Sequence, residues 1–146
     1  MLVKTKLKEF YKNNHLNSDG GVYKNWNKFN IGKITITLPN LNKKGYLLHD
    51  VNHILSQYNI DWFGEFETAA WELGSGGRKG FGLSWLYPLT GTFLGLLIMR
   101  KRTITAYKKG LQRKNAHILS EEFDIINMDI ELLYKLSNKE PIKYSL

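Results

Sequence analysis

Cysteine is absent from the 146 residues of this chain. A disulfide framework, a thiolate metal site and a cysteine nucleophile are therefore excluded. The absence is consistent with a reducing compartment. Residues 1–4 include a lysine and do not form an apolar signal segment. We therefore expect a cytoplasmic protein, or one held peripherally on the inner face of a membrane.

An apolar run long enough to span a membrane is also missing. A spanning helix needs ~20 predominantly apolar residues. The best candidate, LSWLYPLTGTFLGLLIM at 83–99, is shorter and is interrupted by Pro88, Gly91 and Gly95. We expect this run to pack in the core, or else to line an apolar groove for an isoprenoid tail. The basic residues at 100–102 would also suit an apolar surface that rests on anionic lipid.

Acidic residues are missing from Leu73 through Ser120, and the whole chain has a formal net charge of +8. The basic residues in this span are Arg78, Lys79, Arg100, Lys101, Arg102, Lys108, Lys109, Arg113 and Lys114. Such a block is either a solvated face or a surface for phosphate, nucleic acid or anionic lipid. Nucleic acid is not expected, because Tyr107 is the only aromatic residue between Met99 and Ala116 that could stack on bases.

The residues that are present predict an all-α fold. Hydrophobic residues make up 42% of the chain, which suits a single compact helical domain over 1–146, with an extended N-terminal segment. Helices are predicted over 1–14, about 44–58, 62–73, 83–114 and about 120–136. The fourth of these contains the apolar run and continues into the basic residues. Residues 15–30 are predicted as a loop, and 31–41 as an extended segment on the helical core, because no second strand is evident. The four tryptophans are expected in the core: Trp26, Trp62, Trp71 and Trp85.

Two histidines stand four residues apart in the predicted helix 44–58. At 100° per residue, His49 and His53 share one helix face, and Asp50 lies on the flank of the same stripe. The three side chains could therefore converge on one point. His117 has no partner at a metal-ligand spacing and is expected to be an ordinary, satisfied polar residue.

A carboxylate follows at the distance that a helix–turn–helix return requires. Residues 59–61 end the first helix, and Asp61 is a good N-cap for the second. Glu65 would then come back beside the first helix. It lies in the apolar context WFGEF, where a buried carboxylate needs a partner.

Two imidazoles and two carboxylates suit a divalent cation, so His49, Asp50, His53 and Glu65 are predicted metal ligands. Zinc is the first expectation because it accepts both donor types. Iron, manganese and magnesium stay open, because ligand type alone does not select the metal. A site with few protein ligands keeps a position for water or substrate, so the same four residues are the candidate catalytic residues.

The pattern H-D-x-x-H-x11-E over 49–65 resembles the metal motif of the coenzyme Q (ubiquinone) biosynthesis protein 4 family. A Tyr-x-x-Asp turn and Gly-Glu pair, at 58–65, and the basic segment AYKKGLQRKNA at 106–116 are also similar. The resemblance covers roughly residues 44–117. Gln57 stands where the family commonly has glycine, and Asn52 where it commonly has an aromatic or aliphatic residue.

The resemblance implies an all-helical, lipid-associated metalloprotein that acts on a polyprenylated hydroxybenzoate. The implied reaction removes the C1 carboxylate and hydroxylates that carbon, as a metal-dependent oxidative decarboxylase or lyase would. It also implies a scaffolding role among quinone-synthesis proteins, as a homodimer or with other pathway enzymes. Arg78 and Lys79 follow the glycine-rich loop and are candidates to bind an anionic head group, although exposed loop residues are the preferred interpretation.

Two other functions fit parts of the sequence. A metal-dependent phosphohydrolase of the HD class would use His15, then His49 and Asp50, then Asp124, and would not need His53 or Glu65. A non-enzymatic carrier of prenyl lipid or quinone would need an apolar groove but no metal ligands.

Overall fold

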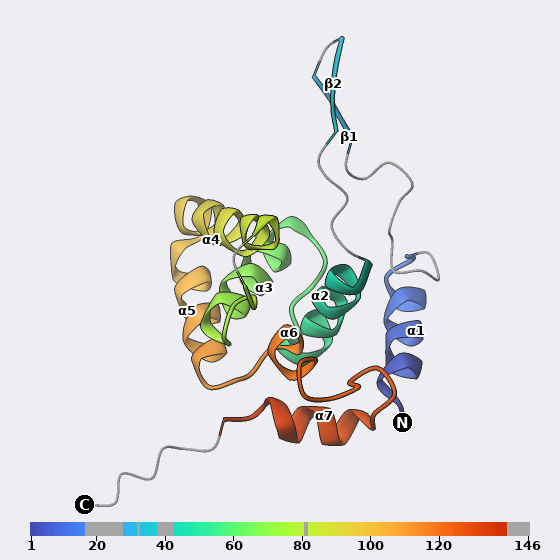
Figure 1. Ribbon diagram of the computed structural model, residues 1–146. Coiled ribbons are helices and arrows are strands. Elements are labelled where there is room, and N and C mark those ends of the chain that lie inside the picture. Colours follow the sequence, from blue (N-terminus) through green and yellow to red (C-terminus); the bar gives the residue numbers. More distant parts are fainter. Residues whose placement is uncertain (17–27, 32, 38–42, 81, 140–146) are drawn as a thin grey trace, which may run out of the picture.

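The computed structural model describes residues 1–16, 28–31, 33–37, 43–80 and 82–139, and helices make up most of these residues (Figure 1). The helices are α1 Val3–Asn13, α2 Lys43–Ser56, α3 Trp62–Gly74, the 3-10 turn η1 Leu83–Trp85, α4 Leu86–Ile98, α5 Arg100–Leu111, α6 Ala116–Leu119 and α7 Ile130–Ser137. The strands β1 Lys28–Ile31 and β2 Ile34–Thr37 form a short hairpin. The all-α class predicted from the sequence is confirmed, because nearly every residue of the core comes from a helix.

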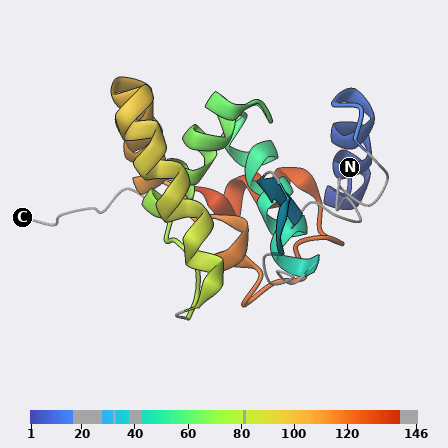
Figure 2. The ribbon, with the colours of Figure 1, turned by 90° about the horizontal axis from the view of Figure 1, so that it is seen from above.

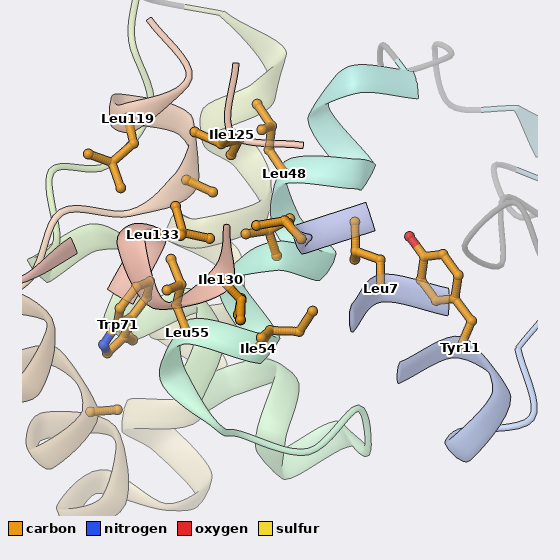
Figure 3. Packing of buried hydrophobic residues seen from close by; sticks show 14 of the residues in the cluster. Leu7, Tyr11, Leu48, Ile54, Leu55, Trp71, Leu119, Ile125, Ile130 and Leu133 are labelled. Carbon is orange, nitrogen blue, oxygen red and sulfur yellow. The ribbon is translucent and has the colours of Figure 1, made fainter. Parts of the chain in front are cut away.

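The apolar core lies between α1, α2, α6 and α7, with α3 closing one side (Figure 3). Its larger members are Leu7, Tyr11, Leu48, Ile54, Leu55, Trp71, Leu119, Ile125, Ile130 and Leu133. The start of the chain is held against the start of α7. The Met1 ammonium group lies 2.7 Å from Asp129 Oδ2, and the Ile130 N–H donates to the Met1 carbonyl oxygen at 2.8 Å.

Helix α3 packs against α4 and α5 at close range (Figures 1 and 2). Glycines make the contact with α5 close. A Cβ added to Gly110 would overlap the carbonyl oxygen of Trp71, and one added to Gly74 would overlap the carbonyl oxygen of Tyr107. The two helix backbones therefore approach each other as near as they do only because both positions lack a side chain.

The hairpin corrects the prediction for the N-terminal part. β1 pairs with β2 in an antiparallel register that sets Phe29 opposite Ile36. Residues 28–30 are therefore strand and not loop, and the segment 34–37 does have a partner. Apolar residues and threonines alternate over 34–37, but the partner strand was missed because the four residues 28–31 are too few to show such a pattern. In Figure 1 the hairpin extends beyond the helices. Residues 17–27 of the predicted loop and 38–41 of the predicted extended segment lie outside the described residues.

Two helix predictions are corrected in the second half. Met99, with φ −142° and ψ 51°, breaks the predicted continuous helix, so α4 and α5 are separate helices that pack on each other. Residues 120–129 form turns rather than the first half of a helix, and α7 begins only after Asp129, whose side chain accepts the Glu131 N–H. Local bonding by Asp and Asn side chains competes with helix formation in such a stretch.

Helix α4 does not pack in the core as the sequence predicts. Its buried residues are Pro88 and Gly95, and its exposed apolar side chains are Leu86, Leu89, Phe93, Leu94, Leu96, Leu97 and Ile98. Within the described ranges, no helix has the length and apolar character needed to cross a bilayer.

Among the tryptophans Trp71 is buried, Trp62 is 78% exposed, Trp85 is half-buried, and Trp26 lies outside the described residues.

The close approach of α3 and α5 predicts opposite effects for two glycine substitutions. Gly110→Ala should lower the free energy of unfolding by about 1–3 kcal/mol, because the new methyl group meets backbone that cannot move away. Gly45→Ala on α2 meets no atom within 4 Å and should raise it by up to ~1 kcal/mol. Urea unfolding in a chelator, at constant m value, measures both. Equal midpoints for the two variants would contradict the packing described.

Candidate metal centre

The turn between α2 and α3 brings the candidate ligands together. Helix α2 ends at Ser56, and the next residue, Gln57, has a left-handed φ of 62°, a conformation that glycine adopts without strain. The Asp61 side chain then caps α3 by accepting the Gly64 N–H at 2.7 Å, which confirms the predicted cap. A Cβ on Gly64 would overlap the Asn59 carbonyl oxygen, so glycine is required for this tight return.

Three of the four predicted ligands meet at one point. The Nε2 atoms of His49 and His53 lie 3.1 Å apart. Glu65 reaches both, with Oε2 at 3.2 Å from His49 Nε2 and Oε1 at 3.1 Å from His53 Nε2. Among the described residues, this is the group of histidine and carboxylate side chains whose ligand atoms are close enough to hold a metal ion.

The separations fit a small cation. A tetrahedral ion with bonds of ~2.0–2.1 Å places its ligand atoms ~3.3–3.4 Å apart, close to the distances between these three side chains. Two imidazoles and one carboxylate are a common donor set for catalytic zinc and for non-haem iron(II). The His53 side chain is fully buried and that of His49 is 13% exposed, whereas that of Glu65 is 30% exposed, so solvent or a ligand reaches the group from the side of Glu65.

Asp50 is the predicted ligand that the structure does not bring to this point. Its Oδ2 accepts a hydrogen bond from the Tyr11 hydroxyl at 2.9 Å, toward α1. Burial raises the pKa of Asp50 to about 6, although His49 and the Tyr11 bond act in the opposite direction. One residue after His49 is a rotation of 100° on a helix, and that rotation carries Asp50 toward α1.

The charges around His49 are strongly coupled. Burial alone would lower its pKa, but Glu72 and Glu65 outweigh burial and raise it to about 10. Burial would raise the pKa of both glutamates, yet the histidines and, for Glu72, also Arg78 hold them below the usual range, to about 2 for Glu72. Without a metal, the group is therefore an imidazolium between two carboxylates.

A second carboxylate, Glu72, lies behind His49 and was not singled out from the sequence. Its side chain is fully buried, and its Oε1 lies 2.8 Å from His49 Nδ1. The signal was available, because Glu72 follows Glu65 by seven residues, two helical turns on one face, in the apolar context AAWEL. The argument that selected Glu65 applies equally to Glu72.

Tyr87 is another residue that the sequence did not single out. Its hydroxyl donates to Glu65 Oε2, and its ring centroid lies 4.5 Å from that of His49. Burial and the two nearby glutamates raise its pKa well above the ordinary value, so it stays a donor. Tyr87 sits in the apolar run at 83–99, where only the tertiary packing shows that it faces a carboxylate.

The two head-group candidates have different environments. The Arg78 side chain is only 8% exposed and donates through Nη2 to Glu72 Oε2 at 2.7 Å, so its expected exposure is wrong. Lys79 is exposed and pairs with Glu121. Arg78 also lies 3.2 Å from His117 Nδ1, while His117 Nε2 is buried with no hydrogen-bond partner in the described part of the chain. Burial, with Arg78 nearby, lowers the pKa of His117 to about 3.

The two residues that only the phosphohydrolase alternative requires, His15 and Asp124, stay apart from this group. His15 and Asp124 are both exposed, and Asp124 Oδ2 accepts a bond from Asn127. Neither contributes a ligand atom to the cluster of His49, His53 and Glu65.

Comparisons with known proteins give no match: no family model fits the chain, and neither the curated proteins nor the solved structures contain a similar one. The fold and the site therefore define the class on their own. It is an all-α protein with a His49, His53 and Glu65 group that could hold a metal ion.

The ion pairs predict how the metal-free protein responds to pH. The pKa of His49 is raised above 6.5 in the folded state, so its stabilising contribution is complete below pH 6.5 and is lost as the pH rises toward 10. The pKa of Glu72 is lowered, so its contribution is present above pH 4.5 and is lost as the pH falls toward 2. Urea midpoints in a chelator should therefore fall between pH 6 and pH 9.

The control is His49→Gln, which should show a smaller fall over the same range because the titrating imidazole is gone. A wild-type midpoint that is constant from pH 6 to pH 9 would contradict the ion pairing.

Proposed function

We propose that this protein is a metal-dependent, lipid-associated protein of quinone biosynthesis. Its substrate is a polyprenylated hydroxybenzoate, from which it removes the C1 carboxylate with hydroxylation of that carbon. The observation that supports this function is the convergence of His49, His53 and Glu65, three positions of the motif that resembles the coenzyme Q biosynthesis protein 4 family, on one point. The chain's own residues fit the metal that the motif implies.

The chain supplies the ligands and their surroundings. His49 and His53 would hold the ion through Nε2, and Glu65 would add a carboxylate oxygen, which the Tyr87 hydroxyl keeps in place. A divalent cation here supplies Lewis-acid stabilisation of the negative charge that develops on an aromatic acid. We propose zinc, which accepts both imidazole and carboxylate ligands, with iron as the alternative. Loss of carbon dioxide with hydroxylation is a two-electron oxidation of the ring, for which dioxygen would be the acceptor; zinc does not change its oxidation state, whereas iron(II), which this donor set also suits, does. Two imidazoles make magnesium the poorer choice.

The charge at the site favours an anionic substrate. A divalent ion together with Arg78 would carry one more positive charge than Glu65 and Glu72 neutralise, and the Asp50 carboxylate beside His49 is turned away from this point toward Tyr11. The open side, at Glu65, would therefore attract a ring carboxylate or phenolate. Arg78 acts in this proposal through the charge that it adds behind the ligands, and the exposed Lys79 remains a candidate for steering the head group.

Helix α4 gives the proposal its lipid-associated part. Exposed apolar residues recur along it at Leu86, Leu89, Phe93 and Leu97, spacings of three and four that line one face. The exposed Arg100 and Lys101 follow directly. An apolar face with a basic end suits a prenyl tail at the surface of an anionic bilayer. A second copy of the chain or another quinone-synthesis protein are the other proposed partners of this face.

The second candidate function is a non-enzymatic carrier of prenyl lipid or quinone. The exposed apolar residues of α4 favour it as much as they favour the enzyme. The two functions differ in their need for Glu65, because a carrier binds lipid without a metal ligand.

Metal content and carbon dioxide release together test the function. The wild-type protein should bind about one divalent ion per chain and release labelled carbon dioxide, in air, from a polyprenylated hydroxybenzoate labelled in its C1 carboxylate. His53→Ala and Glu65→Ala should lose both properties, because each removes a ligand. Elemental analysis after dialysis against zinc or iron(II) measures the first, and scintillation counting the second.

Matched controls are His15→Ala and Asp124→Ala, which should keep the metal and the activity. Metal loss only in these two variants would instead identify the phosphohydrolase. Copurified prenyl lipid in a Glu65→Ala protein, with no carbon dioxide release by the wild type, would identify the carrier.

The α4 face predicts binding to lipid vesicles. Burying one Phe or Leu side chain contributes roughly 1.5–3 kcal/mol, so the double variant Phe93→Glu, Leu97→Glu should weaken binding to anionic vesicles at least ~10-fold. Leu132→Glu is the control, because Leu132 is also exposed but lies on α7, away from α4 in Figure 1. Cosedimentation measures the three proteins. Equal losses in both variants would show that the α4 face is not the contact.

A further inference from the structure

The Glu72 carboxylate occupies a position that the proposed metal centre does not explain by itself. It is not a ligand, and its side chain is fully buried on α3. Its oxygens nevertheless receive three hydrogen bonds. His49 Nδ1 lies at 2.8 Å and Asn52 Nδ2 at 2.7 Å from Oε1, and Arg78 Nη2 lies at 2.7 Å from Oε2.

These contacts determine which nitrogen of His49 carries a proton in the metal-bound state. An ionised carboxylate only accepts hydrogen bonds, and Glu72 is paired with the Arg78 guanidinium group at 2.7 Å. The Nδ1 atom of His49 must therefore be the donor, which leaves the lone pair on Nε2. That atom is the one that lies 3.2 Å from Glu65 and 3.1 Å from His53 Nε2.

The ring of His53 is also held through Nδ1, but by a different group. Its Nδ1 lies 3.1 Å from the carbonyl oxygen of Tyr58, which can only accept. Both histidines thus have Nδ1 fixed by an acceptor and Nε2 directed to the common point. The acceptor behind His53 is a neutral carbonyl, whereas the acceptor behind His49 is a full carboxylate.

We propose that Glu72 is the positioning residue of this metal centre: it holds the ring and the tautomer of His49 and strengthens His49 Nε2 as a ligand. The inference rests on the proposed metal-dependent function and adds a residue to it. A hydrogen-bond acceptor behind a metal-bound histidine fixes the ring and raises the basicity of the ligating nitrogen. Its loss lowers metal affinity roughly 10–100-fold.

The neighbours of Glu72 keep its carboxylate in place. The side-chain oxygen Oδ1 of Asn52 accepts the backbone N–H of Ala116 at 2.7 Å, which directs Nδ2 of the same side chain toward Glu72. Arg78 supplies the opposite charge that a buried carboxylate requires. Asn52 thus donates a hydrogen bond that holds Glu72, at a position where the coenzyme Q biosynthesis protein 4 family commonly has an aromatic or aliphatic residue.

The test is the metal affinity and ligand field of Glu72→Gln, with Glu67→Gln as the matched control. Glu67 lies on the same helix and binds Arg102 through both oxygens, at 3.0 and 2.8 Å, but contacts neither histidine. Zinc affinity, measured by competition with a chelating dye, should fall roughly 10–100-fold in Glu72→Gln and stay unchanged in Glu67→Gln. The visible bands of bound cobalt(II) should shift in Glu72→Gln alone, because a change at His49 alters the ligand field whereas a loss of stability does not.

The outcomes separate the two proposals. A wild-type protein that binds neither zinc nor cobalt overturns the metal centre and the role of Glu72 together. Wild-type affinity and an unshifted cobalt spectrum in Glu72→Gln overturn the role of Glu72 and leave the metal centre intact. If Glu72→Gln does not fold, Glu72→Asp is the second variant. It keeps the charge beside Arg78 but withdraws the carboxylate by one methylene from His49, so it should also bind zinc more weakly, and unchanged binding would overturn the inference.

Discussion

A carboxylate buried without solvent is the constraint on which this structure depends. Removing such a charge from water costs several kcal/mol, and the cost is recovered only if hydrogen bonds and opposite charges surround it. Glu72 meets that condition with donors from α2 and from the loop after α3, where Arg78 supplies the charge. Through these bonds one carboxylate on α3 orients His49 and Asn52 on α2 and holds Arg78 in a buried position.

The same carboxylate connects the candidate site to the rest of the fold. Asn52 joins Glu72 to the start of α6 through the Ala116 N–H, and the buried Asn115 donates to the carbonyl oxygens of Glu72 and Gly77. The C-terminal end of α3 is thereby fixed to a segment more than 35 residues later in the chain. Sites held by rigid helices in this way keep their ligands near the geometry that a metal requires.

Helix α4 has a different role, because it faces two environments. One side carries Gly91 and Gly95, which let it lie close to Ala69 and Phe66 on α3, and Tyr87, which reaches Glu65. The other side exposes large apolar residues such as Phe93 and Leu97. Helix α4 therefore lies between the exposed apolar face and the group of His49, His53 and Glu65, and Tyr87 is its residue that contacts this group.

The sequence by itself determined the local parts of this site. Helical periodicity places His49 and His53 on one face, the Asp61 cap starts α3, and the return distance brings Glu65 back, because each depends on neighbours within a few residues. The tertiary structure alone decided the rest. Asp50 turns to Tyr11 on α1, Arg78 is buried on Glu72, and α4 stays exposed. Which face of a helix is covered depends on elements distant in sequence, and no local pattern contains that information.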